Sequence, residues 1–277
     1  MRVLTWNLWW QFGPWEAREP AILDTIVAVQ PDVVLLQEVW SEGSDSSAAR
    51  IAALLGFDHA LTDDPTAERR NGRPGFHNAI ASRWPLDEVT THPLPEQDGP
   101  VGVRRALSAA VTTGSGLRWR FVSLHLDYQF DASALRQRQC DELLRIVAGI
   151  RGDPEQSPPV IVGGDFNATP DSDEIRMLTG RRKASVRGVV LSDCWEHVGD
   201  GPGPTWRADN PYQEGSTWPN RRLDYVFVSW PRPKPLGNPT RAELVGVEPV
   251  GGIVPSDHAG VVVDLVDEPP PPPTATT

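Results

Sequence analysis

Short apolar runs recur along the whole chain, and several of them are apolar on both faces. Runs of this kind are typical of β-strands that are covered on both sides. We predict eight strands, at residues 2–8, 32–37, 79–82, 107–112, 119–126, 160–163, 225–229 and 260–266. The pattern therefore predicts sheets buried between other layers rather than a sheet with one solvated face.

Longer amphipathic stretches lie between these runs. They predict helices at residues 17–29, 47–55 and 132–150, and a short fourth helix at 171–178 behind Pro170. A mixed α/β chain of 277 residues is long enough to fold as one large domain. We predict a single catalytic domain over 1–268, followed by a Pro-rich disordered tail over 269–277.

Polar side chains stand where the predicted strands end. Asn7 lies at the carboxyl end of the first strand, Glu38 at the end of the second and His125 at the end of the fifth. Asp165 and Asn167 follow the apolar run over 160–162. Because parallel neighbours end at the same sheet edge, these groups are expected to share one rim.

Three more polar groups stand at the start of later strands. Asp224 begins one run, and Asp257 with His258 precedes another. If these strands run antiparallel to the earlier ones, their first residues reach the same rim. Alternation places Glu38 on the strand face of Leu36.

The residue types in this group are consistent with a site that binds a divalent cation and a phosphate. Glu, Asp and Asn oxygens without thiolates suit Mg²⁺, with Mn²⁺ as a substitute. A divalent ion neutralises phosphate charge, and a histidine beside an aspartate handles protons or stabilises an anionic transition state. For Asp165 and Asn167 a turn or helix-cap role is the alternative, and it is compatible with catalysis.

Net charge, hydropathy and cysteine content narrow the classes of protein to which this chain can belong. The formal net charge of -11 equips the chain poorly for nonspecific binding to a long DNA duplex. No apolar run is long enough to cross a bilayer, and the N-terminus does not read as a signal peptide. Cys140 and Cys194 predict two reduced, partly buried thiols in a cytoplasmic protein, with a single disulfide as the alternative.

An ordered series of motifs resembles the endonuclease/exonuclease/phosphatase (DNase I-like) superfamily. The resemblance implies an α/β (α+β) four-layer sandwich, in which two mixed β-sheets pack face to face with helices on the outside. Its motifs are Trp6-Asn7, Leu36-Gln37-Glu38-Val39, Asn78-Ala79-Ile80-Ala81-Ser82-Arg83, Ser123-Leu124-His125-Leu126, Gly164-Asp165-Phe166-Asn167, Arg222-Leu223-Asp224-Tyr225 and Ser256-Asp257-His258.

The resemblance also implies roles for the metal site and the attacking water. Glu38 is expected to be the principal Mg²⁺ ligand, with Asn7 beside it and Asp257 in the same metal region. Asp165 is expected to position or deprotonate the attacking water. Asn167 is expected to hold a phosphate oxygen or a second ion.

Further implied roles concern the phosphate. His258 is expected to contact the scissile phosphate and Asp224 to orient it, while His125 matches a second phosphate-binding histidine. Arg105 matches a supporting strand arginine, although the neighbouring Arg104 leaves the register open.

Two residues are predicted to bind substrate: Asn78, from its motif, and Trp9, beside Asn7. The Trp9 ring suits stacking on a base or a lipid group, or alternatively pins its loop to the core.

The motif Pro204-Thr205-Trp206 resembles the sphingomyelinase-like branch. We therefore predict a Mg²⁺-dependent hydrolase of phosphate esters, a monomer with a small molecule or lipid headgroup as substrate. The alternatives are a DNA or RNA nuclease and a catalytically inactive binding scaffold.

Overall fold

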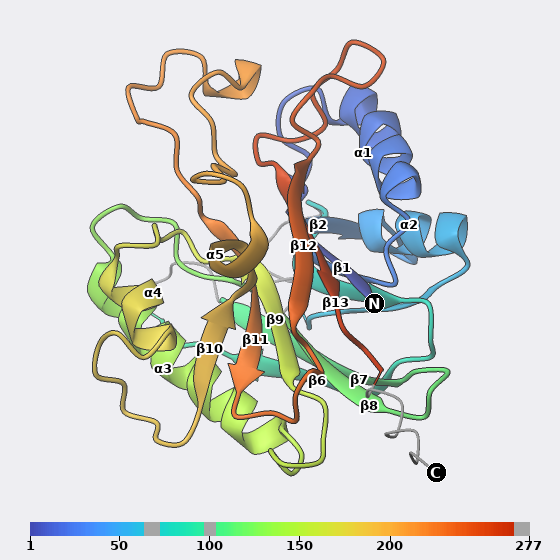
Figure 1. Ribbon diagram of the computed structural model, residues 1–277. Coiled ribbons are helices and arrows are strands. Elements are labelled where there is room, and N and C mark those ends of the chain that lie inside the picture. The colour runs from blue at the N-terminus through green and yellow to red at the C-terminus, as the bar shows by residue number, and fades with distance from the viewer. Residues whose placement is uncertain (64–72, 97–103, 269–277) are drawn as a thin grey trace.

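Two mixed β-sheets packed against each other form the centre of the molecule in a computed structural model (Figure 1). The structure describes residues 1–63, 73–96 and 104–268, so the predicted tail at 269–277 lies outside the described residues. Sheet A has the strand order β12-β13-β1-β2-β5-β4, with β3 beside β2, and sheet B has the order β10-β11-β9-β8-β7-β6.

The helices and strands extend the predicted elements at several ends. The helices are α1 (Trp15–Val29), α2 (Ser47–Leu55), α3 (Ser133–Ile150), α4 (Asp173–Leu178) and α5 (Cys194–Val198), with a 3-10 turn η2 at Pro211–Gln213. The strands are β1 (Arg2–Asn7), β2 (Val33–Glu42), β3 (Asp45–Ser46), β4 (Asp58–Leu61), β5 (Gly75–Ser82), β6 (Asp87–Pro93), β7 (Arg105–Thr112), β8 (Arg118–His125), β9 (Val160–Asp165), β10 (Val190–Asp193), β11 (Asp224–Trp230), β12 (Pro239–Val245) and β13 (Gly260–Leu265).

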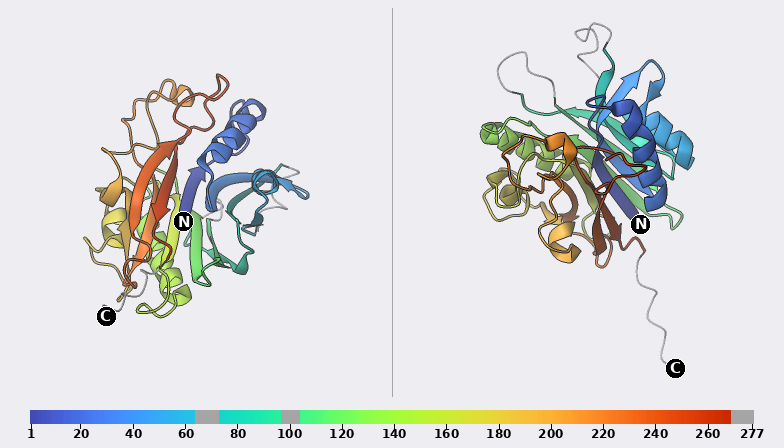
Figure 2. Two further views of the ribbon diagram at one scale, coloured as in Figure 1. Left: turned by 45° about the vertical axis from the view of Figure 1, so that its right-hand side comes forward. Right: turned by 90° about the horizontal axis from the view of Figure 1, so that it is seen from above.

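Three apolar cores separate four layers. One core lies between α1, α2 and the outer face of sheet A, and another lies between α3, α4 and the outer face of sheet B. The third fills the space between the sheets. Figure 2 shows the blue helices and the green and yellow helices on opposite sides of the sheet pair. The predicted four-layer sandwich is confirmed, and burial of both sheet faces explains the doubly apolar strands.

The side chains between the sheets change from apolar to polar toward one end of the strands. Beyond the apolar core come Thr5, Gln37 and Ser123, all fully buried. Gln37 Nε2 donates a hydrogen bond to Ser123 Oγ at 3.1 Å, which in turn donates to the Leu36 carbonyl at 3.0 Å. This polar layer ties the two sheets together, and the next residues along the same strands form the site.

Gly163 allows the sheets to approach closely at this end. A Cβ atom at this position would lie 2.6 Å from Leu35 Cδ1 and 3.1 Å from Thr5 Cβ, both in sheet A. Only a residue without a side chain fits such an approach. Two residues further along, Asp165 therefore faces Asn7 across a narrow gap.

Both cysteines are free, as predicted, but they are buried completely rather than partly. Cys140 belongs to the core under α3, and Cys194 to the core between the sheets. Among the described helices, none is long and apolar enough to cross a membrane.

Candidate active site

Strand directions bring the predicted residues to one rim. β1 runs parallel to β2, and β8 runs parallel to β9, so Asn7, His125 and Asp165 all stand at carboxyl ends. β11 is antiparallel to β9, with Asp224 directly opposite Asp165, and β13 is antiparallel to β1. The predicted antiparallel arrangement is therefore what the structure shows, and it places His258 at the same rim.

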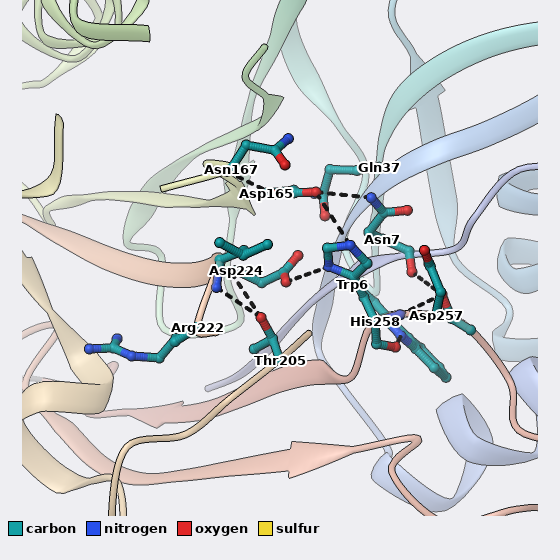
Figure 3. A network of polar contacts seen from close by, with 12 residues as sticks. Trp6, Asn7, Gln37, Asp165, Asn167, Thr205, Arg222, Asp224, Asp257 and His258 are labelled. Carbon is teal, nitrogen blue, oxygen red and sulfur yellow. Dashed lines mark hydrogen bonds and ion pairs between the residues drawn. The ribbon is translucent and has the colours of Figure 1, made fainter. Parts of the chain in front are cut away.

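Asn7 links the two sheets at the centre of the rim. Its Nδ2 donates to Asp165 Oδ2 at 3.1 Å and to Glu38 Oε1 at 3.2 Å. Its Oδ1 accepts the backbone N–H of Trp9 at 2.9 Å. One amide thus holds a carboxylate from each sheet. Figure 3 shows Asn7 beside Asp165.

The backbone at Glu38 differs from the prediction. The strand continues to Glu42 instead of ending at Gln37, and its pairing with β5 shifts register between Leu36 and Val39. Simple alternation would place Glu38 on the Leu36 face, which packs under the helices of sheet A. The bulge gives Glu38 a φ of 51° and turns its carboxylate toward Asn7.

His258 and Asp224 form a buried ion pair. His258 Nδ1 donates to Asp224 Oδ2 at 2.7 Å, and His258 Nε2 lies 3.8 Å from Asp165 Oδ2 (Figure 3). Burial lowers the pKa of His258, but Asp224, Asp165 and Asp257 together raise it well above its usual range. His258 is therefore an imidazolium at neutral pH, with its Nε2 proton directed into the site.

His125 has the opposite protonation state. Burial, together with the charges of Arg104 and His258, lowers the pKa of His125 well below its usual range. Its Nε2 lies 3.4 Å from Asp165 Oδ2 and accepts a hydrogen bond from Asn167 Nδ2 at 3.1 Å. Two histidines whose pKa values are driven apart offer one neutral and one charged contact to an anion.

Three rim carboxylates, of which Asp165 is buried and Glu38 and Asp257 are half-buried, create a demand for positive charge. Burial raises the pKa of Glu38 to about 7, and the charge of Asp257 adds to this shift. Burial and Asp224 raise the pKa of Asp165 to about 6, and burial also raises that of Asp257. Glu38 Oε2 is buried without a hydrogen-bond partner. Hard oxygen donors with an orphaned carboxylate oxygen fit a divalent cation.

A second group of possible metal-ligand atoms is less suited to binding a cation. One ligand atom each of Asp165, Asp224 and His258 lie within 4.8 Å of one another. Asp224 already accepts the Nδ1 proton of His258, and the charged imidazole has no free lone pair. This group is therefore suited to proton transfer, and Glu38 remains the better candidate for the metal.

Arg104 and Arg105 stand where β7 begins, beside the end of β8 that carries His125. Burial lowers the pKa of Arg104, while Glu38 and Asp165 oppose this shift. Arg105 lies on the strand face that packs between the sheets, and its backbone oxygen accepts a hydrogen bond from Asn78 Nδ2 at 2.6 Å. Asn78 thus ties β5 to β7, and substrate binding by Asn78 and Arg105 stays a prediction.

Sequence reasoning missed Arg18, which supports the loop carrying Trp9. Arg18 is 1% exposed, and its guanidinium lies 4.8 Å from the Trp9 ring centroid. The other face of the loop packs on Tyr212, whose ring lies 4.6 Å from that of Trp9. An arginine on an apolar helix face gives no periodic signal, so the spacing could not identify it. Substrate binding by Trp9 stays a prediction.

The raised carboxylate pKa values make metal binding depend on pH. In the metal-free fold, Glu38 keeps its proton up to about pH 7, whereas the unfolded chain has released it. Stability from this proton is thus lost as pH rises through 7, and a bound divalent cation would replace it. We expect the affinity for a divalent cation to fall about 30-fold from pH 8 to pH 5.5 on account of Glu38 alone.

Thermal unfolding with Mg²⁺ and with EDTA at both pH values measures this effect. The gain in Tm from Mg²⁺ is expected to be larger at pH 8 than at pH 5.5. An equal gain at both values would show that no buried carboxylate titrates with metal binding.

The fold and the rim together define a DNase I-like α/β sandwich, a class whose members hydrolyse phosphate esters. The sequence model of the Endonuclease/Exonuclease/phosphatase family matches residues 4–258, and the chain belongs to this family.

Solved structures and a curated relative agree with this family. An endonuclease/exonuclease/phosphatase from Bacteroides vulgatus has a TM-score of 0.74 at 21% identity, over 96% of this chain and 98% of that chain. D. rerio TDP2 complexed with single strand DNA product has a TM-score of 0.72 at 22% identity, over 95% and 97%. Nocturnin from Xenopus laevis is 25% identical over 91% of this chain and 64% of its own length, slightly under two thirds of that protein.

Proposed function

We propose that this protein is a Mg²⁺-dependent phosphoesterase. The observation that carries the proposal is the set of rim carboxylates Glu38, Asp165 and Asp257, all with raised pKa values, beside the charged His258. Carboxylates with so little access to water are costly to ionise unless a cation or an ionised partner offsets their charge. Glu38, with Asn7 and Asp257, would hold the ion.

The chain's own residues divide the remaining work. A divalent ion bound at Glu38 supplies neutralisation of the phosphate and of the leaving oxygen. Asp165 accepts the proton of the attacking water, since its carboxylate is oriented by Asn7 and by the backbone N–H of Asn167. His258 donates from Nε2 to a phosphate oxygen, while Asp224 fixes its ring.

Hydrolysis assays test the reaction. Bis-p-nitrophenyl phosphate, p-nitrophenyl phosphate, sphingomyelin and single-stranded DNA are incubated with the purified protein in Mg²⁺, Mn²⁺ or EDTA. We expect hydrolysis with either ion and none in EDTA. Sphingomyelin as the best substrate would favour the sphingomyelinase-like subclass that the Pro204-Thr205-Trp206 motif predicts, and single-stranded DNA as the best substrate would favour a nuclease. Absence of metal-dependent turnover on every one of them would favour an inactive scaffold.

Replacement of Glu38 tests the ligand assignment separately. Glu38→Gln keeps the shape and the hydrogen bond from Asn7 but removes the charge, so we expect Mg²⁺ binding to weaken at least about tenfold. Isothermal calorimetry measures the affinity, and Glu88→Gln, an exposed glutamate of β6, is the matched control. Unaltered affinity in Glu38→Gln would exclude Glu38 as the principal ligand.

A further inference from the structure

An exposed pair of stacked aromatic rings lies beside the candidate site. The ring centroids of Phe130 and Trp218 are 4.3 Å apart, with an interplanar angle of 11°. Phe130 is 57% exposed and Trp218 is 46% exposed. Rings that were needed only for packing would be buried further, so this stack keeps apolar surface available to a ligand.

The stack joins the loops on either side of the strand that carries Asp165. Phe130 lies on the loop that follows β8 and His125, and Trp218 lies on the segment that leads into β11 and Asp224. In sheet B, β9 runs between β8 and β11. The two rings therefore meet beyond the end of β9, next to the phosphate site.

Guanidinium groups accompany the exposed rings. Arg221 lies 5.3 Å from the Phe130 ring centroid and 5.7 Å from that of Trp218. Arg104 lies 5.8 Å from the centroid of Tyr128, which is 60% exposed. Within the part of the chain that the structure describes, neither arginine forms an ion pair with a carboxylate.

Both arginines lie close enough to the catalytic carboxylate to sense its charge. Burial lowers the pKa of Arg104 and of Arg221, and the Asp165 carboxylate opposes the shift in both. By contrast, Arg222 and Arg136 are neutralised by buried ion pairs with carboxylates of neighbouring elements. Arg104 and Arg221 are thus cations near the site whose charge is left for a ligand.

We propose that Phe130, Trp218 and Arg221, with Tyr128 and Arg104, form a stacking strip that selects a nucleobase beside the cleaved phosphate of a single-stranded nucleic acid. The inference rests on the proposed phosphoesterase activity. Rings alternating with cations are the pattern by which proteins hold a single strand, the bases on the rings and the phosphates on the cations.

The same pattern argues against the other substrate classes. A quaternary ammonium headgroup would be repelled by guanidinium groups at the very rings that it needs. A long duplex would require many more phosphate contacts than two free arginines supply on a chain of net charge -11. A short single strand needs only the local rings and cations.

Two oligonucleotides with the same backbone test the strip. One carries thymine throughout, and the other has abasic residues at the nucleotides flanking the cleaved bond. We expect kcat/KM of the wild-type protein with Mg²⁺ to favour the thymine strand at least about tenfold. The double variant Phe130→Ala/Trp218→Ala is expected to reduce this ratio to about twofold or less.

Trp230→Ala is the matched control. Trp230 is 41% exposed and has Arg232 and Lys234 over its ring, but it lies at the end of β11 remote from Asp224. We expect it to keep the wild-type ratio. Because Phe130 and Trp218 are exposed, the unfolding temperature of the double variant should stay near that of the wild type, which separates a lost contact from lost folding.

The outcomes distinguish failure of the stacking strip from failure of the phosphoesterase activity on which it rests. Equal cleavage of both strands by the wild type, or a tenfold ratio that persists in the double variant, would overturn the strip while leaving the phosphoesterase in place. Hydrolysis of bis-p-nitrophenyl phosphate without cleavage of either strand would do the same. Failure on all three substrates would instead remove the proposed function itself.

Discussion

Asp165→Asn is expected to lower kcat at least about 10³-fold while leaving the protein folded. The amide has the size of the carboxylate, and one oxygen can still accept the backbone N–H of Asn167. It cannot accept a proton from water, and its nitrogen faces the donor Nδ2 of Asn7 in place of an acceptor. Chemistry is therefore lost with little change of shape.

Stability is the second readout for this variant. Burial raises the pKa of Asp165 to about 6, so the ionised carboxylate at pH 8 opposes folding of the metal-free protein. We expect the Tm of Asp165→Asn in EDTA at pH 8 to equal or exceed that of the wild type. Asp24→Asn, an exposed position on α1, is the matched control. Activity within tenfold of wild type would remove Asp165 from the role of base.

The strands that sequence reasoning identified are those with neighbours on both sides. It missed all four edge strands, β4, β6, β10 and β12, as well as the two-residue β3. An edge strand pairs on one side only and carries more polar and charged residues, as in Pro239–Val245. Such a segment has neither a continuous apolar run nor a regular alternation with contrast enough to be recognised.

The rim was predictable because strand ends are fixed by simple rules. Position in the strand and a choice of direction were sufficient to place Asn7, His125, Asp165 and Asp224 together. Glu38 was different, since a β-bulge decides its direction and no residue type in the Leu36-Gln37-Glu38-Val39 motif announces a bulge. The turn at Glu38 costs backbone strain that the surrounding contacts must offset.

The residue types also give no sign of the backbone strain that other residues at the rim show. Six described residues other than glycine have positive φ, and four of them, Trp9, Trp10, Glu38 and Asn167, lie in the candidate site or in the loop that follows Asn7. Non-glycine residues adopt this region only where the surroundings determine it. Their concentration here shows that tertiary contacts rather than local propensity set the geometry of the site.

Arg18 is the group that holds two of these strained residues, and its removal should have a large effect on stability. Its guanidinium donates to the backbone carbonyls of five residues, which are Leu8, Trp9, Trp10, Phe12 and Pro255. Pro255 lies two residues before Asp257, so one side chain fixes the loops that follow Asn7 and precede His258.

Arg18→Met is expected to lower the free energy of unfolding by about 3–5 kcal/mol, because several buried carbonyls lose their donor at once. Arg18→Lys restores the charge but reaches fewer carbonyls, so we expect a smaller loss. Arg50→Met is the matched control, since Arg50 of α2 is half-exposed and its ion pairs with Asp45 and Glu19 are worth about 1 kcal/mol at most.

Urea unfolding in EDTA measures these differences without any contribution from the metal. A loss in Arg18→Met no larger than that in Arg50→Met would show that water satisfies the freed carbonyls and that the loops stand without the arginine. The alternative outcome is a large loss of unfolding free energy, together with reduced Mg²⁺ affinity under conditions where the variant is still folded. That result would mean that Arg18, although it touches neither metal nor substrate, holds Asn7 and Asp257 in the geometry that the ion requires.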